Sequence, residues 1–176
     1  MNTFFDLVRQ RRSHRKFTNE PVAQADIEKI VKTALMAPAG KRANPWEFIV
    51  VTDAEVRNRL STCKPAGGAF VKDAPVAIVV VGDSSKSDVW TEDCSIAAIY
   101  LQLAAEALGL GSCWCQVRLR SSINEGRMAA DEVRDILSLP DNYQVECIIS
   151  IGHKAEERSP FDESRLQIEK IHYGKF

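Results

Sequence analysis

A cluster of basic side chains near the start of the chain is the strongest chemical signal in the sequence. Five basic residues fall within eight positions, with Ser13 and His14 between them: Arg9, Arg11, Arg12, Arg15 and Lys16. Guanidinium groups pair with phosphate oxygens in forked fashion, and a serine hydroxyl adds a further donor. Two interpretations are open. The cluster is either a site for a single anion, or a solvated basic surface that binds nucleic acid weakly.

The overall charge favours the single anion. The 176 residues include 23 Lys and Arg against 24 Asp and Glu, which gives a net charge of −1. A chain this close to neutral has no general positive field to attract nucleic acid or an anionic membrane. The positive charge is therefore local. The length is that of one domain, and we expect residues 1–176 to form it.

The usual catalytic and nucleotide motifs are absent from the sequence. There is no phosphate-binding G-x-x-x-x-G-K-[ST], and the nearest dinucleotide-like stretch, Gly109-Leu-Gly111, runs from a helix into a strand rather than the reverse. The three histidines have no G-x-S-x-G or H-E-x-x-H partner, and the cysteines form no C-x-x-C pair. We expect no metal site and no catalytic set of side chains, so a bound cofactor would carry the chemistry.

Hydrophobic periodicity predicts five helices and four strands in the chain. Helices are expected at residues 3–12, 25–35, 53–60, 93–108 and 128–137, and strands at 46–52, 74–82, 112–117 and 145–151. A capping box of Thr3 and Asp6 would begin the first helix. The strand at 74–82 is almost entirely apolar, which is typical of a strand covered on both faces. The helix at 93–108 is apolar nearly all round, and should be buried in the core or against a second subunit.

The two ends of the chain give weaker signals. The apolar residues of the N-terminus precede its basic cluster, the reverse of a secretory signal, so we expect a cytoplasmic protein. In a cytoplasmic protein, five scattered cysteines are expected to be free thiols rather than disulfides. Residues 153–176 show no periodicity, and such a tail is expected to lie over a surface.

Three stretches of the chain resemble the FMN-dependent nitroreductase family. Residues 11–17 (RRSHRKF) are similar to its R-R-S-x-R-x-F, residues 37–46 (APAGKRANPW) to its A-P-S-x-x-N-x-Q-P-W, and residues 104–114 (AAEALGLGSCW) to its A-x-x-L-G-L-G-S-C-W. Residues 151–157 (IGHKAEE) are also like its I-G-x-x-x-E-x segment. The resemblance thus covers nearly the whole chain.

The resemblance implies a fold and an assembly. The fold would be α+β with three layers, in which helices flank a central mixed, mostly antiparallel sheet of four to five strands. The family forms obligate homodimers that hold one FMN per subunit at the dimer interface. The tail at residues 153–176 would then pack on the partner subunit.

The family's FMN contacts can be carried over position by position, and they fall into three groups. The phosphate, ribityl chain and pyrimidine edge would be held by Arg11, Arg12, Ser13 and Arg15. The same flavin would be reached from the other subunit by Pro38, Ala39, Gly40, Arg42 and Asn44. The isoalloxazine would be approached by the backbone of Leu110 and Gly111, and the phosphate by Arg158. The second group departs from the family pattern, because Ala39, Arg42 and Asn44 stand where Ser, Asn and Gln are usual.

The function implied is hydride transfer by a ping-pong mechanism. NADH or NADPH would reduce the flavin at N5, and a small electron-poor acceptor such as a nitroaromatic, quinone or enone would be reduced in turn. No catalytic side chain is expected beyond the flavin, although Arg15 would polarise it. The alternatives are another FMN enzyme of the same superfamily, a flavin-binding protein without turnover and, more remotely, a nucleic-acid-binding module that uses the basic N-terminus.

Overall fold

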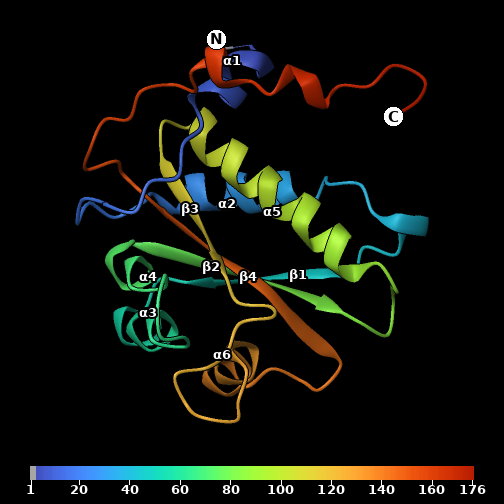
Figure 1. Ribbon diagram of the computed structural model, residues 1–176. Helices are drawn as coiled ribbons and strands as arrows, with labels where there is room; N and C mark the ends of the chain where they lie inside the picture. Colours follow the sequence, from blue (N-terminus) through green and yellow to red (C-terminus); the bar gives the residue numbers. More distant parts are fainter. Residues whose placement is uncertain (1–2) are drawn as a thin grey trace.

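A four-stranded sheet lies between two layers of helices in the computed structural model, which describes residues 3–176 (Figure 1). The strands are β1 (Trp46–Val51), β2 (Val76–Asp83), β3 (Gly111–Gln116) and β4 (Tyr143–Gly152), in the spatial order β1-β2-β4-β3. All pairings between these strands are antiparallel. Within residues 3–176 the one parallel contact is an isolated bridge between Ser13 and Ser112. The predicted α+β class, with helices on both faces of the sheet, is confirmed.

β2 occupies the centre of the core. All eight of its residues are buried, as predicted for a strand covered on both faces. Val76, Ile78 and Val80 pack into the apolar cluster that includes residues of the helices on one face of the sheet. The alternate residues, such as Ala77 and Val79, pack into the cluster on the other face. This alternation follows from the two-residue period of a strand.

The helices divide between the two faces, as Figure 1 shows. One layer contains α1 (Phe4–Gln10), α2 (Gln24–Ala34) and α5 (Trp90–Ala107). The other contains α3 (Ala54–Ser61), α4 (Phe70–Asp73) and α6 (Ala129–Leu137). Single 3₁₀ turns occur at η1 (Gly40–Arg42), η2 (Glu163–Arg165) and η3 (Ile168–Lys170). The sequence did not predict α4, because four residues are too few for a helical stripe.

The first helix begins as predicted and ends earlier. The Thr3 hydroxyl accepts a hydrogen bond from the Asp6 backbone N–H at 3.2 Å, and the Asp6 carboxylate accepts one from the Thr3 N–H at 3.0 Å. This is the expected capping box. Helix α1 ends at Gln10 rather than near Arg12, so most of the basic cluster lies beyond the helix.

α5 is not buried all round within a single chain, so of the two expected settings, the core or a second subunit, the core alone does not cover it. Ile96 and Ile99 are 38% and 37% exposed, whereas the polar residues Asp93, Gln102 and Glu106 are buried. The polar positions can face inward because at least two of them have partners there. Asp93 accepts from Gly40, and Glu106 pairs with Lys154. An apolar stripe is left on the outer face of the helix.

The C-terminal tail lies beside α1 and continues away from the body of the chain (Figure 1). The Phe161 N–H donates to the Arg9 carbonyl at 2.8 Å. Beyond that point the exposed side chains include five large apolar ones: Leu166, Ile168, Ile171, Tyr173 and Phe176. No helix found within residues 3–176 has both the length and the apolar character needed to cross a membrane.

Candidate functional site

The basic segment is fixed along one end of the sheet by backbone hydrogen bonds. The His14 N–H donates to the Ser112 carbonyl at 2.9 Å, and the Thr18 N–H donates to the His153 carbonyl at 3.0 Å. The Ala155 N–H donates in return to the Lys16 carbonyl at 3.2 Å. Residues 13–18 therefore contact the first residues of β3 and the residues that follow β4. This attachment holds the cations of the segment in place.

Cys113 of β3 lies near several of the residues that are predicted to contact the phosphate. Burial raises the pKa of its thiol, because an apolar environment disfavours the thiolate. Four other influences lower the pKa of this thiol. From largest to smallest, they are the charge of Arg15, a hydrogen bond with Ser13, the charge of Arg11 and the charge of Arg158. All four residues are thus close enough to influence one buried thiol. The structure brings together three arginines and a serine that lie up to 147 positions apart in the sequence.

The members of this cluster differ in the partners they already have. Arg158 donates to the Glu156 carboxylate through Nε at 3.2 Å and Nη2 at 2.8 Å, and Lys16 pairs with the same carboxylate at 3.2 Å. Arg12 donates to the Ser159 carbonyl at 2.8 Å, so it ties the tail to the cluster. Among residues 3–176, neither Arg11 nor Arg15 has a carboxylate within ion-pair distance. Arg12 donates to backbone carbonyls and has no carboxylate partner among the same residues, so three guanidinium charges are left for an external anion.

Leu110 and Gly111 lie where β3 begins. Leu110 is buried in the core, and its N–H donates to the Ala105 carbonyl at 2.9 Å. A Cβ atom on Gly111 would come within 2.9 Å of His14 Cβ and 3.0 Å of Lys154 Cγ. A glycine is therefore required here so that residues 13–18 can pack against β3.

The second predicted group, residues 38–44, forms a strained loop at the N-terminal end of α5. The Gly40 N–H donates to Asp93 Oδ1 at 2.8 Å, and the Ser87 hydroxyl donates to Asp93 Oδ2 at 3.0 Å. Arg42 and Asn44 both have positive φ, 57° and 44°, and both are exposed. Left-handed backbone at an arginine is uncommon, and such strain is often found where a loop serves a ligand.

Within one chain these two groups do not meet. Loop 38–44 lies at the beginning of α5, whereas Gly111 and the arginine cluster lie just beyond its end (Figure 1). The 18 residues of α5 span about 27 Å at 1.5 Å per residue. One chain alone therefore supplies two separated parts of the predicted site.

An apolar groove runs along α5 between these parts. It has a volume of about 930 Å³ and is formed by residues of α1, α2 and α5, together with Arg11. Phe4 and Phe5 beside it are exposed, as are Ile96 and Ile99. Apolar surface of this extent is unusual on a chain that works alone.

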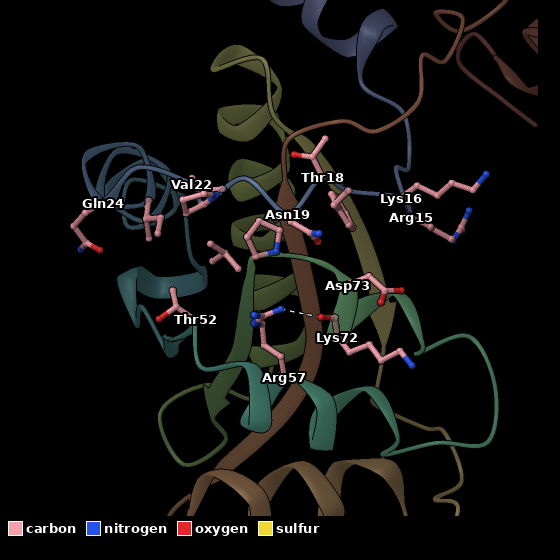
Figure 2. Close-up of a pocket in the computed structure, with 15 residues that line it drawn as sticks. Arg15, Lys16, Thr18, Asn19, Val22, Gln24, Thr52, Arg57, Lys72 and Asp73 are labelled. Atoms are coloured by element: carbon pink, nitrogen blue, oxygen red, sulfur yellow. Dashed lines mark hydrogen bonds between the residues drawn. The ribbon is translucent and has the colours of Figure 1, made fainter.

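Two residues that hold the site were not found from the sequence. Asp93 fixes loop 38–44 through its hydrogen bond with Gly40. Phe70 lies beneath Arg15, with the guanidinium carbon 5.9 Å from the ring centroid. No pattern in the sequence predicts the contact of Asp93 with Gly40 or that of Phe70 with Arg15. Arg15 also lines a separate cavity on the other side of its segment (Figure 2).

The chain is similar over most of its length to known proteins of one family. The model of the nitroreductase family matches residues 8–66 and 62–153. The solved structure of an FMN-dependent nitroreductase from Clostridium difficile R20291 has a TM-score of 0.95 and 46% identity, and the match covers 98% of this chain and 100% of that one. A provisionally named NADH dehydrogenase/NAD(P)H nitroreductase of Archaeoglobus fulgidus is 35% identical, with 100% of both chains covered. An NADH dehydrogenase of Thermus thermophilus is 25% identical over 92% of this chain and 91% of its own.

Proposed function

The chain belongs to the nitroreductase family, and from this premise we propose that it is an FMN-dependent oxidoreductase. It would take hydride from NADH or NADPH and pass it to an electron-poor small molecule such as a nitroaromatic, quinone or enone. The observation that carries the proposal is the attachment of the basic segment to the beginning of β3, where Ser13 bridges Ser112 and the His14 N–H donates to the Ser112 carbonyl. The charges of Arg15, Arg11 and Arg158 all act on Cys113 of the same strand. The names of the relatives, which include FMN, NADH and NAD(P)H, support it.

The donor set fits the phosphate of FMN. A phosphate monoester carries nearly two negative charges at neutral pH and three strong acceptor oxygens. Arg11 and Ser13 offer a guanidinium fork and a hydroxyl, and Arg158 adds a second fork if it exchanges Glu156 for phosphate. Arg12 would act from the tail side, where it holds the Ser159 carbonyl.

Arg15 is the residue that we propose for polarising the flavin. Bound FMN would supply the hydride chemistry in a ping-pong cycle, and the side chains would position it and exclude water. Arg15 lies over Phe70 and has no carboxylate partner within the described residues, so its charge is free to face the pyrimidine edge. Charge fixed in place before reaction is more effective than charge that must reorganise.

We further propose that the working unit is a homodimer. If two chains pack their α5 helices side by side in opposite directions about a two-fold axis, loop 38–44 of one chain comes to the arginine cluster of the other. The same arrangement would cover the apolar groove and the exposed side chains of α1 and α5. The tail at residues 153–176 would continue onto the partner, where its apolar side chains would find cover.

The absorbance spectrum of the purified protein after incubation with FMN tests the cofactor, and turnover tests the activity. We expect a yellow protein that oxidises NADH or NADPH when a quinone or a nitroaromatic is added. A protein that binds no supplied FMN would overturn the proposal. A yellow protein that shows no oxidation with either nicotinamide and either acceptor would instead be a flavin-binding protein without turnover.

A further inference from the structure

A second cavity, separate from the flavin contacts except at Arg15, lies on the outer side of residues 15–24. Its volume is about 740 Å³, within the usual range for small-molecule pockets. The walls come from residues 15–22, the beginning of α2, Thr52 after β1, α3, α4 and the beginning of β2 (Figure 2). None of the residues that we assign to loop 38–44 or to the β3 end contributes to it.

The cavity carries an excess of positive charge. Four cationic side chains line it, Arg15, Lys16, Arg57 and Lys72, against the single carboxylate of Asp73. Lys16 is paired with a carboxylate outside the cavity, at 3.2 Å. In the part of the chain that the structure describes, the other three cations have no ion-pair partner. Because we assign the charge of Arg15 to the flavin, Arg57 and Lys72 beside the carboxylate of Asp73 leave about one free positive charge, which would attract a phosphate monoester.

Arg57 is positioned to act as the fixed donor of this cavity. Its Nη1 donates to the Lys72 carbonyl at 2.8 Å and to the Ala74 carbonyl, so the guanidinium is held between α3 and α4. Its Nε is buried, so a ligand in the cavity cannot reach it. Its Nη2 makes no hydrogen bond within residues 3–176 and is not buried, so this donor is left for a bound anion. In Figure 2, Arg57 reaches into the cavity from α3, the charged ends of Arg15 and Lys16 lie near each other, and the side chain of Lys72 extends away from Arg57.

The rest of the lining is apolar or neutral. Phe17, Pro21, Val22 and Pro75 contribute apolar surface, and Thr18 and Asn19 contribute neutral hydrogen-bonding groups. A simple inorganic ion would use only the charged part. A ligand with a phosphate at one end and a ring at the other would use both.

We propose that this cavity binds an organic phosphate. Arg57 would contact the phosphate, the exposed and flexible side chain of Lys72 would turn toward it, and the Pro21 side would contact the organic part. The site is distinct from that of FMN, and it does not depend on turnover. The phosphate could belong to the reductant, as the 2′-phosphate of NADPH, or to a separate phosphorylated metabolite. Both sources present the same chemistry to the cavity.

Calorimetric titration of the FMN-loaded protein with 2′,5′-ADP, 5′-AMP and adenosine tests the site. We expect both phosphates to bind and adenosine to bind far more weakly. Lys72→Gln should raise the Kd for 2′,5′-ADP about tenfold, as expected for the loss of one charge-assisted contact. Arg59→Gln is the matched control, because Arg59 is on α3, exposed and outside the cavity. Arg57→Lys, which keeps the charge and loses the fork, should also weaken binding.

Three results would overturn the proposal: no binding of either phosphate, equal weakening by Lys72→Gln and Arg59→Gln, or binding that occurs only after FMN is removed. The last would mean that the probe occupies the flavin's own site. Kinetics then separate the two sources. A KM for NADPH that rises in Lys72→Gln while the KM for NADH does not would assign the phosphate to the reductant. Unchanged KM values, with no competition between NADPH and 2′,5′-ADP, would assign it to a separate metabolite.

Discussion

Arg15 has a defined position before any ligand binds. Its guanidinium lies over the Phe70 ring, and its charge acts on the buried Cys113 thiol. If it faces FMN as proposed, Arg15→Ala should raise the Kd for FMN about tenfold or more, since it removes a charged donor. Fluorescence titration of the FMN-free protein measures this, with Arg59→Ala as the exposed arginine control. A variant that retains FMN as tightly as the wild type would remove Arg15 from the site.

His14 links the same segment to the stability of the protein. It is only 2% exposed, and its Nδ1 has no hydrogen-bond partner. Burial is the main cause that lowers its pKa from 6.5, and the charges of Lys154 and Arg158 lower it further. The carboxylates of Glu106 and Glu156 act in the other direction and are outweighed.

Acid should therefore destabilise the folded chain through His14. The unfolded state binds this proton more readily, so the stability that His14 contributes is present above its unfolded pKa and is lost as the pH falls through the lower folded value. Between about pH 7.5 and about pH 5, the free energy of unfolding should fall more for the wild type than for His14→Gln, which does not titrate there. Urea unfolding at each pH provides the comparison. Parallel pH profiles for the two proteins would contradict it.

At the scale of elements, the outer face of α5 is where the single chain is incomplete. Ile99 lines the apolar groove and stands on the exposed stripe of the helix. Ile99→Glu would place a charge in the proposed interface, where it would have no partner. Light scattering should then give a mass near 19.6 kDa, whereas the wild type should give about twice that value. The amount of FMN that remains bound should fall as well, because the proposed site is complete only in the dimer.

The control for this change is Ile123→Glu. Ile123 is 60% exposed and precedes α6, in the opposite helical layer from α5. It should leave the mass of the dimer unaltered. If Ile99→Glu remained dimeric, α5 would have to be excluded as the interface.

The elements also show what could and could not be predicted from the sequence. β2 was predictable because its pattern is local, an unbroken apolar run. The inward polar residues of α5 were not, because Glu106 pairs with Lys154, 48 positions away. Loop 38–44 was placed by resemblance alone, since Arg42 does not signal a positive φ and Asn44 signals one far more weakly than a glycine would. The basic segment was found from composition, but its meeting with Arg158 depends on the pairing of β3 with β4.

At the scale of the whole molecule, a dimer would explain why loop 38–44 and the arginine cluster lie so far apart in one chain. Loop 38–44 and the arginine cluster lie at opposite ends of an 18-residue helix, and apolar surface lies between them. Neither group can form a flavin site with the other in the same chain. An antiparallel pair of α5 helices would bring loop 38–44 of each chain to the arginine cluster of the other, and would create two equivalent sites. The site would then belong to the dimer rather than to the chain.

Mixing two defective variants tests this directly. One subunit carries Arg15→Ala, and the other carries Arg42→Gly with Asn44→Gly, in which glycine tolerates the positive φ of 57° and 44°. If each site takes its arginines from one chain and its loop from the other, a mixed dimer has one intact site and one doubly altered site. Random reassortment should restore about a quarter of the wild-type activity, since about half of the dimers are mixed and each has one working site of two. Each variant alone, unfolded and refolded in the same way, is the control. Activity that stayed at the level of the separate variants, with mixed dimers shown by mass spectrometry, would mean that both parts of each site come from a single chain.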